Sequence, residues 1–107
     1  MKTLNIRDAR RLVEQNEDLT VVETLPAEYF DEFHLPGAKN VPLDEDFEKA
    51  MRQAVPDEES PVMVYCMDRN CDASEKAAAR LERMGYTDVY DLPGGKIEWK
   101  ENGLPTE

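Results

Sequence analysis

Apolar residues recur along the chain at helical spacing in some segments and as short β-branched runs in others. The helical segments, two of them brief, are predicted at residues 5–16, 26–33, 44–55, 72–84 and 96–102. The β-branched or continuous apolar runs predict strands at residues 19–24, near Val41, at 61–66 and at 87–92. Strands and helices therefore alternate along the whole sequence.

This alternation predicts the α/β fold class, with three layers and a mainly parallel sheet flanked by helices. Residues 61–66 form a continuous apolar run, which is typical of a central strand covered on both faces. The chain has 107 residues and contains no repeat, low-complexity tract or linker. We therefore expect a single domain over residues 1–107.

The formal net charge of the chain is −11. Such a surface is repelled by phosphate backbones and anionic lipids, so we expect neither nucleic acid nor a membrane as a partner. No apolar run approaches the length of about twenty residues that a membrane-spanning helix needs. The N-terminal residues lack the apolar core of an export signal, and we therefore expect a cytoplasmic protein.

Cys66 stands at the end of the most apolar predicted strand, just before a polar loop and a helix. In an open α/β sheet, ligands bind beyond the carboxyl ends of the strands. Backbone amides and the positive end of the helix dipole are expected to converge on the sulfur, lower its pKa and favour the nucleophilic thiolate. The alternative stays open that Cys66 is a small buried hydrophobic residue, as free cysteines often are.

The loop after Cys66 holds the second cysteine of the chain, Cys71. Both cysteines are expected to be reduced in the cytoplasm, and two are too few for a structural zinc site, so we expect no metal. The loop leads into a helix at which Asp72 and Glu75 have the spacing of a capping box, with Ser74 as an alternative cap. We expect the single histidine, His34, to fix its loop by hydrogen bonds and the single tryptophan, Trp99, to pack into the core.

Three stretches, taken together and in this order, resemble the rhodanese family. "VVETLPAEYFDEFHLPGAKNVPL" resembles its first signature, in which a strand and an acidic-aromatic helix precede a His-Leu-Pro-Gly-Ala motif. "VMVYC", followed by a loop and an Ala-rich helix ending in "MGY", resembles its active-site segment. "VYDLPGGKIEWKENGLP" resembles its closing segment, and the resemblance spans residues 4–106.

The resemblance implies a parallel five-stranded sheet flanked by helices and a catalytic cysteine, here Cys66, that accepts sulfane sulfur as a persulfide. It implies transfer of that sulfur to a thiol or another thiophilic acceptor, without a metal or an organic cofactor. The implied partner is a small-molecule sulfur donor or acceptor, or a protein that bears a persulfide or a thiol. The residues expected to bind the substrate are those of the loop: Met67, Asp68, Arg69, Asn70, Cys71, Asp72 and Ala73.

The chain departs from the family pattern in this loop, which is about two residues longer than usual and contains no glycine. Asp72 stands where the phosphatase-like branch has its arginine, so we do not expect phosphate-ester chemistry. Arg69 is the only cation inside the loop and is a candidate for binding an anionic donor. Asp68 and Asp72 oppose thiolate formation, because a neighbouring negative charge raises the pKa of a thiol.

Three roles stay open for Cys71: it resolves a persulfide or sulfenate on Cys66, it carries sulfur handed on from Cys66, or it is a passive loop residue. Three functions of the protein also stay open. The first is a sulfurtransferase or persulfide carrier that uses Cys66. The others are a dithiol redox protein that uses Cys66 and Cys71, and a catalytically silent rhodanese-like binding module.

Overall fold

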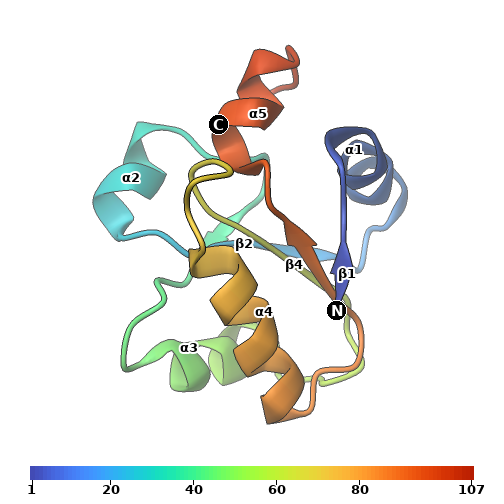
Figure 1. The fold of residues 1–107 in the computed structure, drawn as a ribbon. Helices are drawn as coiled ribbons and strands as arrows, with labels where there is room; N and C mark the ends of the chain where they lie inside the picture. The colour runs from blue at the N-terminus through green and yellow to red at the C-terminus, as the bar shows by residue number, and fades with distance from the viewer.

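The computed structural model describes residues 1–107 and contains one five-stranded sheet with five helices (Figure 1). The strands are β1 (Lys2–Thr3), β2 (Thr20–Glu23), β3 (Lys39–Asn40), β4 (Val62–Tyr65) and β5 (Val89–Leu92). The helices are α1 (Ile6–Gln15), α2 (Ala27–Glu32), α3 (Phe47–Ala54), α4 (Ala73–Met84) and α5 (Gly95–Glu101). All strand pairs are parallel, and the strand order is β1-β5-β4-β2-β3. The predicted α/β class with a parallel sheet flanked by helices is confirmed.

The helices lie on both sides of the sheet, with α1 and α5 on one side and α3 and α4 on the other (Figure 1). The core is divided in the same way into two apolar clusters. One cluster contains Phe47 and Met51 of α3 and Leu81 of α4, and the other contains Ile6 of α1 and Trp99 of α5. None of the five helices is long and apolar enough to cross a bilayer.

The central strand β4 contributes to both clusters, because successive side chains of a strand point to opposite faces. Val62 and Val64 pack on the side of α3 and α4, whereas Met63 and Tyr65 pack on the side of α1 and α5. All four residues are fully buried, as the apolar run predicted. Cys66 follows Tyr65 and returns to the side of α4, where its sulfur lies beside that helix.

Most predicted elements are present, and the differences are local. Strand β1 is not apparent from the sequence, because its two residues are too few to show a period and are ordered by pairing with Tyr90 and Asp91 of β5. The predicted capping box at the start of α4 is wrong: Asp72 makes no capping hydrogen bond and instead forms an ion pair with Lys76, 3.2 Å away. Gly85 ends α4 in a left-handed conformation, as expected.

The two single-copy residues have the structural roles expected of them. His34 Nδ1 lies 2.9 Å from the carbonyl oxygen of Phe30, and its backbone exchanges hydrogen bonds with Glu107. Trp99 is 2% exposed, and its indole N–H donates to the carbonyl oxygen of Pro105. The C-terminal residues are therefore held against the loop after α2 and the end of α5.

Candidate functional site

The candidate site is the sulfur of Cys66, at the carboxyl edge of the sheet between β4 and α4. Cys66 is 0% exposed. Its thiol donates to the carbonyl oxygen of Cys71 at 3.3 Å, and its Sγ lies 3.6 Å from Ser74 Oγ in the first turn of α4. The sequence therefore placed Cys66 correctly at the helix N-terminus, but Ser74 faces the sulfur and does not cap the helix.

The expected lowering of the Cys66 pKa is wrong, because burial raises the pKa of this thiol from 9.0 to about 11. The neighbouring Cys71 thiol raises it further, whereas hydrogen bonds from the amide and hydroxyl of Ser74 lower it. The helix N-terminus thus acts in the predicted direction, but desolvation of the charged form is the larger effect. Cys66 is a protonated thiol at neutral pH in this conformation.

The loop between Cys66 and α4 is built around Asp68. Its carboxylate accepts a hydrogen bond from the amide of Asn70, and its carbonyl oxygen accepts one from the amide of Cys71. Two of the amides expected to surround the sulfur are therefore already occupied. The amides of Asp72 and Ala73, next to the start of α4, make no hydrogen bond within the protein.

Arg69, the only cation in the loop, is 61% exposed and forms two hydrogen bonds with the Glu98 carboxylate, at 2.8 and 3.1 Å. Glu98 belongs to α5, so this pair joins the loop to that helix. An anionic donor at Arg69 has to compete with the carboxylate of Glu98.

The start of α5 holds the first two residues of the loop in place. The amide of Lys96 donates to the carbonyl oxygen of Cys66, and that of Ile97 donates to the carbonyl oxygen of Met67. Gly95 makes this approach possible, because its φ is +67° and a Cβ there would lie 2.5 Å from the Met67 oxygen. The "PGG" turn predicted after β5 therefore positions the backbone of the candidate nucleophile.

A cleft of about 410 Å³ opens beside the site. Its walls come from the segment after β2, the segment after β3 and the start of α4: Thr24, Leu25, Pro26, Ala27, Pro42, Leu43, Asp44, Asp72, Ala73 and Lys76. Cys66 does not line this cleft. The cleft therefore reaches Asp72 and Ala73 at the start of α4, whose amides have no hydrogen-bond partner, whereas Cys66 itself is buried.

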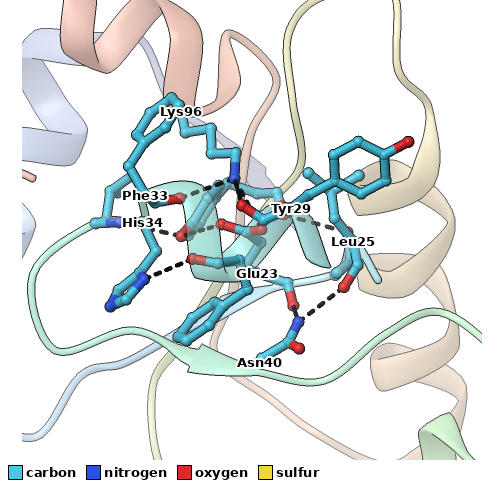
Figure 2. Close-up of polar contacts among 11 residues, drawn as sticks. Glu23, Leu25, Tyr29, Phe33, His34, Asn40 and Lys96 are labelled. Carbon is cyan, nitrogen blue, oxygen red and sulfur yellow. Dashed lines mark hydrogen bonds and ion pairs between the residues drawn. The ribbon is translucent and has the colours of Figure 1, made fainter. Parts of the chain in front are cut away.

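A buried polar network lies on the opposite face of the sheet (Figure 2). The Lys96 ammonium donates to Glu23 Oε2 at 3.1 Å and to the carbonyl oxygens of Tyr29 and Phe33 at 2.6 and 2.8 Å. The Tyr65 hydroxyl donates to Glu23 Oε1 at 2.8 Å. Burial raises the pKa of Tyr65 well above its ordinary value, so this phenol stays protonated.

This network fixes the segment that surrounds β2. Lys96 is 0% exposed, and its three ammonium protons each have an acceptor, two of which are carbonyl oxygens of α2 and its C-terminal end. Asn40 adds a further tie, since its side-chain amide donates to the carbonyl oxygens of Glu23 and Leu25 (Figure 2). No feature of the sequence near Lys96 distinguishes it from a solvated lysine, because all its partners are more than sixty positions away.

Asp91, on β5, is a second buried group that sequence reasoning missed. It is 4% exposed, and its Oδ1 has no hydrogen-bond partner. Burial raises the pKa of this carboxyl above its ordinary value of 3.8. Its signal in the sequence is a single acid inside the apolar run "VYDL". No group of three or more His, Cys, Asp or Glu side chains is arranged to hold a metal ion.

The fold and the cysteine site agree with comparisons to known proteins. Residues 5–102 match the Rhodanese-like domain family, and the chain belongs to this family. It is 30% identical over 102 residues to the thiosulfate sulfurtransferase GlpE of Coxiella burnetii, covering 92% of this chain and 87% of that protein.

Longer proteins contain similar domains. The chain is 32% identical over 99 residues to the adenylyltransferase and sulfurtransferase UBA4 of Candida albicans, but this region is only 23% of that protein. The crystal structure of the BH2092 protein from Bacillus halodurans superposes with a TM-score of 0.87 at 26% identity, covering 99% of this chain and 76% of that one. Sulfurtransferases are therefore among the relatives of this chain.

Proposed function

We propose that this protein is a sulfurtransferase that carries sulfane sulfur as a persulfide on Cys66. The observation that carries the proposal is the position of the Cys66 sulfur, 3.6 Å from Ser74 Oγ at the N-terminus of α4, in a chain of the rhodanese-like family. A helix N-terminus stabilises a negatively charged group beside it, and an ionised persulfide is such a group.

The reaction has two displacement steps. In the first, Cys66 loses its thiol proton to solvent, its thiolate attacks the outer sulfur of a donor persulfide, the S–S bond of the donor breaks, and the donor leaves as a thiolate. In the second, an acceptor thiolate attacks the outer sulfur of the Cys66 persulfide and regenerates the Cys66 thiolate. Each step exchanges one S–S bond for another, so no external oxidant or reductant is needed.

The covered sulfur requires a movement of the loop before either step. Cys66 is 0% exposed, whereas Asp72 and Ala73 line the cleft beside it. The carbonyl oxygens of Cys66 and Met67 are held by α5, so the movement involves residues 68–72. We propose that the amides of Asp72 and Ala73 bind the outer sulfur once the cysteine is loaded.

The charge of the protein favours one class of donor. A net charge of −11 repels small inorganic anions, and the only loop cation, Arg69, is paired with Glu98. We therefore propose a persulfide- or thiol-bearing protein, or an uncharged small persulfide, as donor or acceptor. Cys66 and Cys71 are both free thiols, and free thiols persist in a reducing compartment. We therefore propose that the domain works in the cytoplasm.

Intact mass spectrometry tests this function. The protein is incubated with a small organic persulfide or with thiosulfate, and the expected product is the protein plus one sulfur atom. Cys66→Ser abolishes the adduct, and Cys71→Ser, the matched control, retains it. Absence of an adduct with every donor would contradict the proposal and favour the silent binding module.

A dithiol redox function is the second candidate. The Cys66 thiol donates to the carbonyl oxygen of Cys71 at 3.3 Å, and the Cys71 thiol is near enough to raise the pKa of Cys66. Mild peroxide is expected to convert this pair to a disulfide, with a mass loss of two hydrogen atoms. If the Cys71→Ser variant responds to peroxide as fully as the wild type does, the dithiol redox function is excluded.

A further inference from the structure

Helix α2 has no apolar face buried in the protein. It contains six residues, Ala27–Glu32, and none of them is buried. Most helices in proteins owe their stability to packing of an apolar face, and an isolated helix of this length is not stable in water. In Figure 1, α2 lies at the edge of the molecule. Its position must therefore be fixed by other contacts.

The Lys96 ammonium supplies two such contacts. It donates to the carbonyl oxygen of Tyr29 in α2 at 2.6 Å and to that of Phe33, directly after α2, at 2.8 Å (Figure 2). Hydrogen bonds from an ionised donor are roughly twice as strong as neutral ones. Lys96 is 0% exposed, so water does not compete for these bonds. The third proton goes to Glu23, which anchors the ammonium to the end of β2.

The N-terminal end of α2 forms part of the cleft beside Cys66. Pro26 and Ala27, the residue before the helix and its first residue, line this cleft. Leu25, one position earlier, is held by Asn40, whose side-chain amide donates to its carbonyl oxygen at 2.7 Å. The carbonyl oxygen of Pro26, in contrast, accepts hydrogen bonds from amides of α2. The place of Pro26 and Ala27 in the cleft wall therefore depends on where α2 is held.

The backbone of Lys96 is bonded to the candidate nucleophile. Its amide donates to the carbonyl oxygen of Cys66 at 3.1 Å. One residue thus contacts the backbone of Cys66 through its main chain and the helix that continues the cleft wall through its side chain. Lys96 therefore links the position of the cleft wall to that of Cys66.

We propose that Lys96 is a positioning residue, whose side chain holds the cleft wall at Pro26 and Ala27 in place so that the cleft binds the sulfur-carrying substrate next to Cys66. This inference rests on the proposed function of Cys66 as the sulfur carrier. The wall is apolar at Leu25, Pro26 and Ala27, which suits the uncharged part of a persulfide substrate. Lys96 itself does not line the cleft and takes no part in the exchange of S–S bonds.

The test measures sulfur loading of Cys66 by intact mass spectrometry at increasing concentrations of one donor, the methyl ester of N-acetylcysteine persulfide. A Cys71→Ser parent leaves Cys66 as the only thiol. Lys96→Met in this parent retains most of the side-chain volume and removes the ammonium. The half-saturating donor concentration is expected to rise about tenfold, because a displaced wall weakens binding, whereas the limiting rate stays within about twofold of the parent. An unchanged half-saturating concentration would overturn the inference.

Glu23→Gln combined with Lys96→Met separates positioning from stability. Lys96→Met alone leaves the Glu23 carboxylate buried without its counter-charge, which destabilises the protein. The double variant removes that charge, keeps an acceptor for the Tyr65 hydroxyl, and does not restore the hydrogen bonds to the carbonyl oxygens of α2 and Phe33. We therefore expect it to regain stability and to keep the raised half-saturating concentration. Recovery of both would show a purely structural role and overturn the inference.

Met51→Ala is the matched control for a general loss of stability. Met51 is fully buried in the apolar cluster on the side of α3 and α4, and it does not line the cleft. The cavity left by the truncation lowers the stability of the protein. The half-saturating concentration of this variant is expected to equal that of the parent. A rise as large as in Lys96→Met would show that instability alone explains the effect, and would reject the role of Lys96.

The same experiment separates failure of this inference from failure of the proposed function. If the parent is loaded with sulfur and Lys96→Met has the same half-saturating concentration, Cys66 keeps its proposed function and Lys96 has no positioning role. If the parent takes up no sulfur from this donor or from thiosulfate, the proposed function fails, and the inference that rests on it fails as well.

Discussion

Lys96 Nζ and Glu23 Oε2 lie 3.1 Å apart, and both side chains are 0% exposed. The pair joins the first helical turn of α5 to the end of β2, on the face of the sheet opposite to the Cys66 sulfur. Every proton of the ammonium has an acceptor, and Tyr65 donates to the second carboxylate oxygen. A buried pair with such complete hydrogen bonding is costly to break on one side only.

Lys96→Met tests this pair. The variant leaves the Glu23 carboxylate buried without its counter-charge, and the free energy of unfolding is expected to fall by about 3–5 kcal/mol. Denaturant unfolding followed by tryptophan fluorescence measures the loss through Trp99. The double variant Glu23→Leu with Lys96→Met is the control, and it is expected to recover part of the stability because no unpaired charge remains. Equal losses in the single and double variants would contradict this account.

Asp91→Leu is expected to stabilise the protein, and by an amount that depends on pH. The folded pKa of Asp91 lies above its ordinary value of 3.8, so the folded wild type binds the proton more tightly than the unfolded chain. Wild type therefore loses stability as the pH rises through this interval. The difference in unfolding free energy between variant and wild type is expected to be smallest below pH 3.8 and to grow until Asp91 is ionised in the folded protein. A difference that stays constant with pH would contradict the raised pKa.

Gly95→Ala and Gly37→Ala form a matched pair. Both glycines have a positive φ, +67° and +70°, so an alanine costs about 1–2 kcal/mol of backbone strain at either position. At Gly95, the added Cβ also lies 2.5 Å from the Met67 oxygen, whereas at Gly37 no atom lies within 4 Å. We therefore expect a larger loss of stability from Gly95→Ala, together with faster alkylation of Cys66. Indistinguishable unfolding curves for the two variants would argue against the close approach of α5.

The two cysteines are expected to react at different rates. Cys66 is buried and has a pKa raised to about 11, whereas Cys71 is partly exposed. At pH 7.5, a limiting amount of iodoacetamide is expected to label Cys71 first, which peptide mapping by mass spectrometry measures. Preferential labelling of Cys66 would show that the loop over the sulfur opens readily in solution.

The sequence predicted those features that depend on neighbouring residues. The apolar run from Pro61 to Cys66 indicated a central strand, and the position of Cys66 at its end followed from the break in that run. Gly85 was recognisable as a helix terminator because a left-handed residue at that place is determined locally.

Features that depend on distant partners could not be predicted in this way. The pKa of Cys66 is dominated by burial, which is set by packing of β4 against α4 and by the covering loop, and the helix N-terminus that the sequence reveals is the smaller effect. Lys96 is fully buried although lysine is usually solvated, because its ammonium is bound by Glu23 and by two carbonyl oxygens from α2 and the residue that follows this helix. Neither outcome has a local signature.

Tyr65 and Cys66 are adjacent in the chain but project from opposite sides of one sheet. The pleat of the strand thus places the Tyr65 hydroxyl, which belongs to the buried polar network, and the Cys66 sulfur on opposite faces, although only one peptide unit separates the two residues. The sulfur contacts Ser74 of α4, and the Tyr65 hydroxyl contacts Glu23 and Leu35. Lys96 of α5 reaches both sides, because its amide holds the Cys66 carbonyl oxygen and its ammonium holds the Glu23 carboxylate. Lys96 is therefore the residue through which a substitution on one side of the sheet is transmitted to the other.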